Sequence, residues 1–249
     1  DINEDNHKNI WICAKYGNLY VLPSVNSNIS YHSGSANKTP ERILSIHKSS
    51  KEALWLGTDG SGLTKVAFNS NGSTDETQYF NDKVLNTGFY VQSITEDSRF
   101  NIWLGTYKNG LWFHNTLNDT FEKINITNLK RQEATDVRTV FKDSKGRIWV
   151  GSNISINVYN ANLKLLASFE NNTNGLKGSN TESIIEDKNG TIWLGIYGGG
   201  FFKFNENHNV LQNSSFSNHT YTNPNNKHDI PSIKSMAIDD SGNIWQINN

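Results

Sequence analysis

Adjacent acidic residues recur along the chain and are the first candidates for chemistry. The pairs are Glu4-Asp5, Glu96-Asp97 and Glu186-Asp187. Two carboxylates facing one bond could act as an acid and a base, but neighbours on a strand point to opposite faces. Their repetition favours turn capping, because an Asp side chain can accept hydrogen bonds from its own turn backbone.

The other reactive side chains form no recognised catalytic motif. The seven histidines show no His-x-x-x-His or Glu-x-x-His spacing, and Cys13 is the single cysteine. This excludes an internal disulfide and every multi-cysteine metal site. No Gly-x-Ser-x-Gly elbow occurs, and Gly198-Gly-Gly200 does not open a helix as a phosphate-binding loop would. We expect no catalytic residue, no metal and no cofactor.

Charge and hydropathy exclude two further classes of function for the chain itself. The formal net charge is -1, so the positive excess that neutralises a row of phosphates is missing and nucleic acid is not an expected partner. The sequence contains no signal peptide and no run of about 18 apolar residues, the length of a transmembrane helix. A trimmed ectodomain would have the same appearance.

The regular spacing of the tryptophans indicates the structural elements that position the candidate residues. Six of the seven tryptophans occupy one local context at intervals of 44, 48, 46, 44 and 52 residues, and they are Trp11, Trp55, Trp103, Trp149, Trp193 and Trp245. A period near 46 residues with β-type patterning is typical of a propeller blade, a four-stranded sheet that must stack on its neighbours. A residue repeated in every blade is best explained by packing between blades rather than by sugar stacking.

Each unit has the same order of strands. A first strand of the pattern apolar-x-Ser/Thr-apolar, such as 91–94 or 137–140, ends in an acidic turn. A second strand containing Trp-apolar-Gly follows, then a glycine-bearing loop and a third strand such as 110–113 or 200–204. The fourth strands are less regular, with 121–124 and 165–169 as candidates.

These patterns predict an all-β fold, a β-propeller of about five blades plus a final hairpin. The expected blades are 1–40, 41–86, 87–132, 133–178 and 179–229, with an incomplete one at 230–249. No third and fourth strands remain to complete the last hairpin, so we expect this to be part of a longer propeller. A metal site that gathers one residue from each blade stays an open alternative.

The string from Val91 to Leu111 resembles the two-component regulator propeller repeat, and units at 137–158 and 181–201 match it with departures. The resemblance implies a seven-bladed propeller in the periplasmic sensor region of a Bacteroidetes-type hybrid two-component histidine kinase. It further implies a neighbouring β-sandwich domain and, in many members, recognition of oligosaccharides. The kinase and DNA-binding output parts of that family lie outside this chain.

Two sets of variable loops should share one face of the propeller, those entering each first strand and those joining the second strand to the third. Function concentrates on loops held by a rigid scaffold. Aromatic and polar residues on these loops suit an oligosaccharide or another small polar ligand, and the candidate ligand-binding residues are Tyr16, Arg42, Asp59, Phe89, Tyr90, Tyr107, Lys108, Arg138, Asn153 and Tyr197.

Three functions remain open on this pattern. A sensory ectodomain would bind a glycan and pass a rigid-body movement to a neighbouring domain or a second copy in a homodimer. A protein-interaction platform would use the same loops, since Tyr and Arg are also favoured at protein interfaces. An enzyme similar to the streptogramin lyases would need convergent His and Glu residues with a metal, and the sequence offers no such set.

Overall fold

The computed structural model describes residues 2–5, 8–13, 19–22, 30–32, 42–51, 53–68, 74–80, 88–129, 131–220 and 232–248. Strands dominate these residues, and one short 3-10 helix, η1 (Leu211–Asn213), is the only helical element among them. The all-β prediction is confirmed. Each repeat forms antiparallel strands in the order first, second, third, fourth.

The strands follow the repeat unit by unit. The first two units comprise β1 (Ile2–Glu4), β2 (Ile10–Cys13), β3 (Leu19–Leu22), β4 (Ser30–His32), β5 (Ile43–Lys48), β6 (Ala53–Gly60), β7 (Leu63–Phe68) and β8 (Thr74–Phe80). The third and fourth comprise β9 (Phe89–Glu96), β10 (Ile102–Tyr107), β11 (Gly110–Asn115), β12 (Thr120–Ile124), β13 (Val137–Lys142), β14 (Ile148–Ser152), β15 (Ser155–Tyr159) and β16 (Leu165–Glu170). The last elements are β17 (Thr181–Glu186), β18 (Ile192–Ile196), β19 (Gly200–Asn205), β20 (Ser215–Asn218), and the hairpin β21 (Ile233–Ile238) and β22 (Ile244–Asn248).

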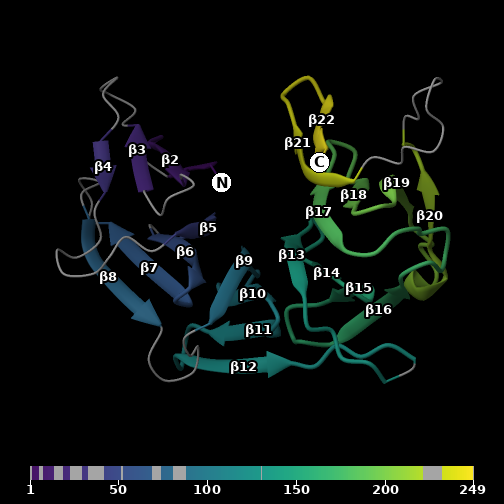
Figure 1. Ribbon diagram of the computed structural model, residues 1–249, viewed down its shortest axis with the longest axis horizontal. Helices are drawn as coiled ribbons and strands as arrows, with labels where there is room; N and C mark the ends of the chain where they lie inside the picture. The colour runs from purple at the N-terminus through teal and green to yellow at the C-terminus, as the bar shows by residue number, and fades with distance from the viewer. Residues whose placement is uncertain are drawn as a thin grey trace.

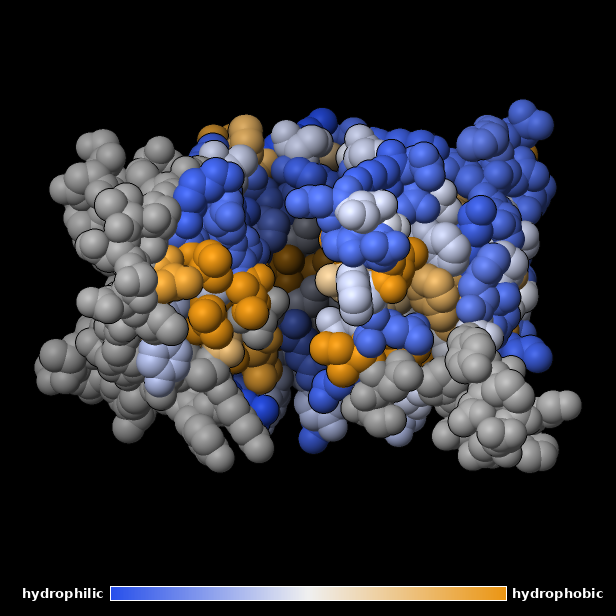
Figure 2. Space-filling view, turned by 90° about the horizontal axis from the view of Figure 1, so that it is seen from above, coloured by the Kyte–Doolittle hydropathy of each residue, from blue (hydrophilic) through white to orange (hydrophobic). Residues whose placement is uncertain are grey.

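The units lie side by side around an arc, with the first strand of each unit innermost (Figure 1). β5, β9, β13, β17 and β21 are successive neighbours along the inside of this arc. β1–β4 and the β21–β22 hairpin lie at its two ends (Figure 1). Seen from that side, apolar residues gather on both surfaces that flank the opening (Figure 2). Ile2, Trp245 and Ile247 are each about two-thirds exposed at 65%, 65% and 64%.

One junction between units is more than side-chain packing. β6 continues past its own hairpin and pairs with β9 of the next unit through Asp59 with Tyr90 and Gly60 with Phe89. The second and third units thereby form one eight-stranded sheet. This backbone pairing fixes the relative position of two blades, where the repeat pattern alone predicts separate four-stranded sheets.

The glycine of each second strand has a packing role. A Cβ added to Gly105 would lie 2.7 Å from the carbonyl oxygen of Val137 and 3.1 Å from its Cγ1. The first strand of the next unit therefore lies directly against the glycine. The same approach recurs at Gly57, Gly151 and Gly195, whereas Cys13 occupies this position in the first unit. The glycine of the repeated Trp-apolar-Gly pattern is thus required by the close packing of neighbouring blades.

The repeated tryptophans lie between neighbouring blades, as the sequence predicts. Trp103 contacts Tyr159 of the following unit, with ring centroids 5.6 Å apart, and Trp149 packs edge-on against Phe204 at 4.9 Å. Both are fully buried. Trp193 is only partly buried, and Trp245 in the final hairpin is exposed, so packing diminishes toward that end of the arc.

An aspartate six residues before the tryptophan organises each acidic turn. Asp143 accepts hydrogen bonds from the Arg147 backbone N–H and from Trp149 Nε1, both at 2.8 Å. The same indole-to-aspartate bond recurs in four other units, at Trp11, Trp103, Trp193 and Trp245. In the second unit, Ser49 replaces the aspartate. Turn capping by these aspartates is confirmed, and the bond to the tryptophan extends it.

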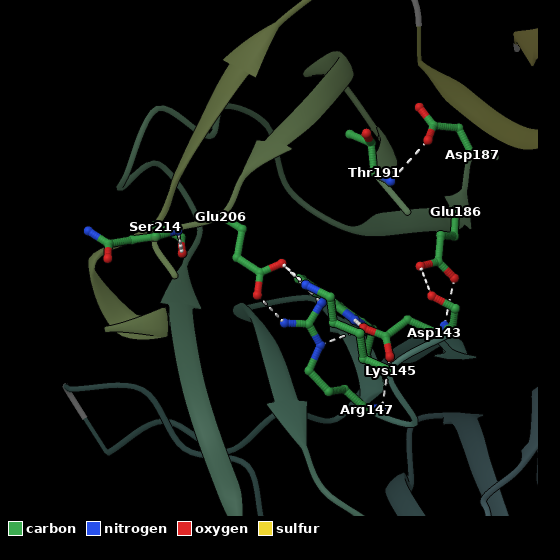
Figure 3. A network of polar contacts seen from close by, with 11 residues as sticks. Asp143, Lys145, Arg147, Glu186, Asp187, Thr191, Glu206 and Ser214 are labelled. Carbon is green, nitrogen blue, oxygen red and sulfur yellow. Dashed lines mark hydrogen bonds and ion pairs between the residues drawn. The ribbon is translucent and has the colours of Figure 1, made fainter. Parts of the chain in front are cut away.

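The glutamates of the acidic pairs connect neighbouring units. Glu96 accepts hydrogen bonds from Ser49 Oγ at 2.6 Å and from the Ser50 hydroxyl in the preceding turn. Glu186 does the same with the backbone N–H and Oγ of Ser144, at 2.7 and 2.6 Å. Figure 3 shows this contact beside Arg147, which lies between Asp143 and Glu206. These carboxylates are occupied by structural bonds.

Candidate binding face

The two variable loop sets meet through one repeated backbone hydrogen bond. The N–H of Asp59 donates to the carbonyl oxygen of Arg42 at 2.8 Å. The N–H groups of Asn153 and Tyr197 make the equivalent bonds to Asp136 and Asn180, both at 2.9 Å. The loop that enters a first strand therefore lies beside the loop that follows its second strand. We call this end of the blades the variable face and the opposite end the acidic-turn face.

Five of the sequence-predicted residues form one continuous group across the second and third units. Arg42 Nη1 forms an ion pair with Asp59 Oδ2 at 3.0 Å. Asp59 pairs with Tyr90 through the sheet, and the Tyr90 ring meets Tyr107 edge-on with centroids 6.0 Å apart. Lys108 Nζ lies 5.1 Å from the centroid of the Tyr107 ring. We call these five residues the tyrosine–lysine cluster.

Every first strand from β5 onward carries a bulge near its entrance. The register of pairing shifts by one residue at the same place in each unit, and the extra residues are Leu44, Gln92, Arg138, Glu182 and Lys234. A bulge redirects a side chain and interrupts the ladder. The repeat thus contains a position on the innermost strands where the side chain differs between units. In three of the units this residue is charged, as Arg138, Glu182 and Lys234.

Arg138 is the centre of a second cluster. Its Nε and Nη1 atoms donate to Asp136 Oδ2 and Glu182 Oε1, both at 2.9 Å, so it joins two units. Burial alone would lower the pKa of Arg138, but the bonds and charges of both carboxylates outweigh it and raise that pKa. Burial raises the pKa of Glu182 despite its pairing with Arg138. We call Asp136, Arg138 and Glu182 the carboxylate–arginine cluster.

The remaining predicted residues occupy other surroundings. Phe89 is buried and meets the Trp112 ring edge-on at 5.3 Å, so it supports the loop from beneath. Asn153 accepts a hydrogen bond from the Asp136 backbone N–H through Oδ1 at 3.3 Å, which fixes the loop that carries Asp136. Tyr197 is 47% exposed on the variable face. Tyr16 lies outside the described residues.

Two members of the face were not among the residues predicted to bind a ligand. Asp136 and Glu182 flank Arg138 and determine its charge environment. Glu182 could have been found by aligning the repeats, because it occupies the same position as Arg138 in the next unit. The signal for Asp136 is weaker, because residues just before the first strand vary in type among the units.

No three His, Cys, Asp or Glu side chains gather at metal-binding distance within the described ranges. Over the same residues, no helix has the length and hydropathy to cross a bilayer. The polar groups of the variable face include Tyr hydroxyls, ion pairs, backbone groups and the Lys108 ammonium, which suit hydrogen bonding and ring stacking.

The repeat is similar to repeats of known proteins. A family model described as "Two component regulator propeller" matches residues 132–153 and 175–198. Histidine kinase P4 of Formosa agariphila is 31% identical over 162 residues, which are 63% of this chain and 11% of that kinase. The chain therefore spans a small part of that relative.

Two solved structures share the fold. A streptogramin B lyase structure matches with a TM-score of 0.71 at 14% identity, over 98% of this chain and 74% of the lyase. The extracellular domain of the hybrid two component system BT4673 from B. thetaiotaomicron matches with a TM-score of 0.63 at 17% identity, over 99% of this chain and 36% of that domain. Both likenesses establish the propeller fold. Two segments of the chain, in consecutive blades, match the two-component regulator propeller model.

Proposed function

We propose that this propeller is part of the sensor ectodomain of a hybrid two-component signalling protein. The observation that carries the proposal is the two-component regulator repeat in the fourth and fifth units. The similarity to a histidine kinase over 162 residues and to an extracellular domain of a hybrid system supports it. The intact protein would then hold this propeller in the periplasm, with a histidine kinase encoded elsewhere in its chain.

The ligand of the sensor is an oligosaccharide or glycan fragment. Half-buried tyrosines beside ion pairs and amide groups can stack on the apolar faces of sugar rings and bond their hydroxyls. The tyrosine–lysine cluster supplies two aromatic rings within 6.0 Å of each other. The carboxylate–arginine cluster supplies acceptors and donors in the neighbouring units. Binding without turnover is the expected activity.

Thermal unfolding of the purified chain in a panel of neutral and acidic oligosaccharides tests this proposal. A ligand that binds only the folded state raises the melting temperature in a saturable way. A matched pair of variants, Tyr107→Ala on the variable face and Trp193→Phe near the acidic-turn face, separates surface contact from general stability. Loss of the ligand-induced shift in Tyr107→Ala alone supports binding at this face, and an unchanged shift in Tyr107→Ala contradicts it.

A protein-interaction platform is the second candidate, because the same half-buried tyrosines and the exposed Arg42 suit a polypeptide partner. The partner could be a neighbouring β-sandwich domain or a second copy in a homodimer. Small-angle scattering of the chain with and without oligosaccharide distinguishes the platform from the glycan sensor. A dimer that forms with rising protein concentration and does not respond to any sugar favours the platform.

A lyase is the third candidate, favoured by the TM-score of 0.71 to a streptogramin B lyase. Fold does not choose the chemistry, which depends on the side chains of the site. Incubation of the chain with streptogramin B, followed by mass analysis, tests it. Cleavage of the antibiotic would replace the sensor proposal with an enzyme.

A further inference from the structure

Lys108 adopts a backbone conformation that its neighbours in the repeat leave to glycine. Its φ is 68°, in the left-handed region. The corresponding residues in the second and fifth units are Gly60 with φ 103° and Gly198 with φ 67°. A side chain in this region is disfavoured because Cβ approaches the backbone. A lysine here costs stability that a glycine would spare.

The surroundings hold the lysine in place at the edge of the variable face. Thr106 Oγ1 donates to the Gly110 carbonyl oxygen at 2.7 Å across the turn, and the Gly110 N–H donates to the Thr135 carbonyl oxygen at 3.0 Å. Asn109 Nδ2 reaches the Gly88 carbonyl oxygen at 3.4 Å. The turn is therefore tied to the start of its own unit and to the following unit, so its backbone is preorganised.

The charge of Lys108 is not neutralised by the described residues. Its ammonium lies over the Tyr107 ring, and no carboxylate within the described part of the chain forms an ion pair with it. Nearby, Arg42 and Asp59 neutralise each other. In the carboxylate–arginine cluster, Asp136 and Glu182 both pair with the Arg138 guanidinium, and the charge of Lys234 also acts on Glu182. An anion approaching the variable face would find its favourable site at Lys108.

We propose that Lys108, Tyr107 and Tyr90 form an anion subsite that binds the carboxylate or sulfate group of an acidic oligosaccharide. The ammonium binds the anionic group, and the exposed part of the tyrosine pair contacts the ring that carries it. This inference rests on the proposed function and narrows it, because the Arg138 guanidinium is already paired with two carboxylates, whereas the Lys108 ammonium has no ion pair among the described residues. Neutral sugars would lack the charge that the subsite recognises.

Titration calorimetry of the 249-residue chain with matched probes tests the subsite. The probes are tetragalacturonate, its fully methyl-esterified form, a sulfated carrageenan tetrasaccharide and its desulfated form. We expect an acidic probe to bind about tenfold more tightly than its neutral counterpart, since a charge-assisted contact has about that effect. This preference should diminish as salt is raised.

Three variants separate the charge from the backbone. Lys108→Gln should abolish the preference for the acidic probe. Lys108→Gly should abolish it too and yet raise the melting temperature of the unliganded chain by about 2 °C, because the left-handed strain is relieved. Lys203→Gln is the matched control, since Lys203 Nζ also lies over an aromatic ring, that of Trp193, but its backbone belongs to a regular strand, β19.

The outcomes distinguish this inference from the proposed function. Acidic and neutral probes that bind equally, with no change in Lys108→Gln, overturn the anion subsite and leave the glycan sensor intact. Absence of binding by every acidic probe to the folded chain also overturns the subsite. If neutral sugars fail in the wider thermal panel as well, the glycan sensor fails with it. A loss of preference in Lys203→Gln would show that the effect is not local.

Discussion

The two ends of the blades follow different rules. At the acidic-turn face, one aspartate accepts from its turn backbone and from the tryptophan indole in five of the units. At the variable face, the backbone bonds repeat but the side chains on them differ from unit to unit. Repetition of a side chain together with its partner indicates packing, whereas a repeated backbone with changing side chains indicates recognition.

Asp143→Ala should cause the largest loss of stability. Asp143 has no exposed side-chain surface, and it pairs with Arg147 while accepting from the Trp149 indole. Removing one partner of a buried charged pair costs about 3 kcal/mol or more. Urea unfolding measures the change, and binding of any ligand found for the variable face should keep its affinity in the folded variant.

Asp239→Ala is the matched control for that variant. Asp239 accepts from the Asn243 backbone N–H and from the Trp245 indole as Asp143 does in its own turn, but Asn243 replaces the arginine partner and the hairpin is exposed. A much smaller loss is expected, because water can replace the missing acceptor. Equal losses for the two variants would contradict the view that burial at the acidic-turn face, rather than turn geometry, provides the stability.

Much of this architecture could be predicted from the sequence, because packing repeats at every blade. The strand order and the position of tryptophan between blades follow from periodicity. The pairing of β6 with β9 could not be predicted, since it depends on β6 reaching Gly60 beside the loop that enters β9. The charge balance around Arg138 was also out of reach, because a bulge determines which side chains meet there.

Gly105→Ala should cost about 2 kcal/mol, as expected for overpacking where the backbone of the next blade lies in contact. The added Cβ would lie 2.7 Å from the Val137 carbonyl oxygen. Cys13→Ala is the control, since Cys13 already carries a side chain at the equivalent position of the first unit. Thermal unfolding measures both. A tolerated Gly105→Ala would show that the blades can move apart without loss.

Acidification should destabilise the chain through His47. Burial lowers the pKa of His47 to about 4, with Glu96 raising it and Lys142 lowering it further. The unfolded chain therefore takes up the proton first, near the ordinary value of 6.5, and stability falls as the pH drops from there toward 4. Between pH 7 and 5.5 the loss should be about 1 kcal/mol.

His47→Gln checks the origin of this dependence, because glutamine keeps a polar side chain without a titration in this range. Unfolding free energies of both proteins at pH 7, 6 and 5.5 should diverge in slope, with the variant showing the flatter profile. A steep profile in His47→Gln would assign the dependence elsewhere, and His114 is the next candidate, since burial lowers its pKa as well.

The smallest effect concerns the glutamates that link neighbouring turns. Glu96→Gln should cost about 1 kcal/mol, because a buried carboxylate that accepts from Ser49 and Ser50 becomes an amide with one acceptor oxygen. Glu186→Gln changes the same kind of bond at a more exposed turn and should cost only about 0.3 kcal/mol. Denaturant unfolding of the two variants compares them directly.

A larger loss for Glu186→Gln than for Glu96→Gln would reverse this order, and the link between turns would then depend on local charge rather than burial. The fourth-unit turn contains Lys145, Arg147 and Glu206 in one ion-pair network close to Glu186 (Figure 3). Raising the salt concentration separates the two causes, because screening weakens the exposed charges there and leaves the buried bonds of Glu96 nearly unchanged.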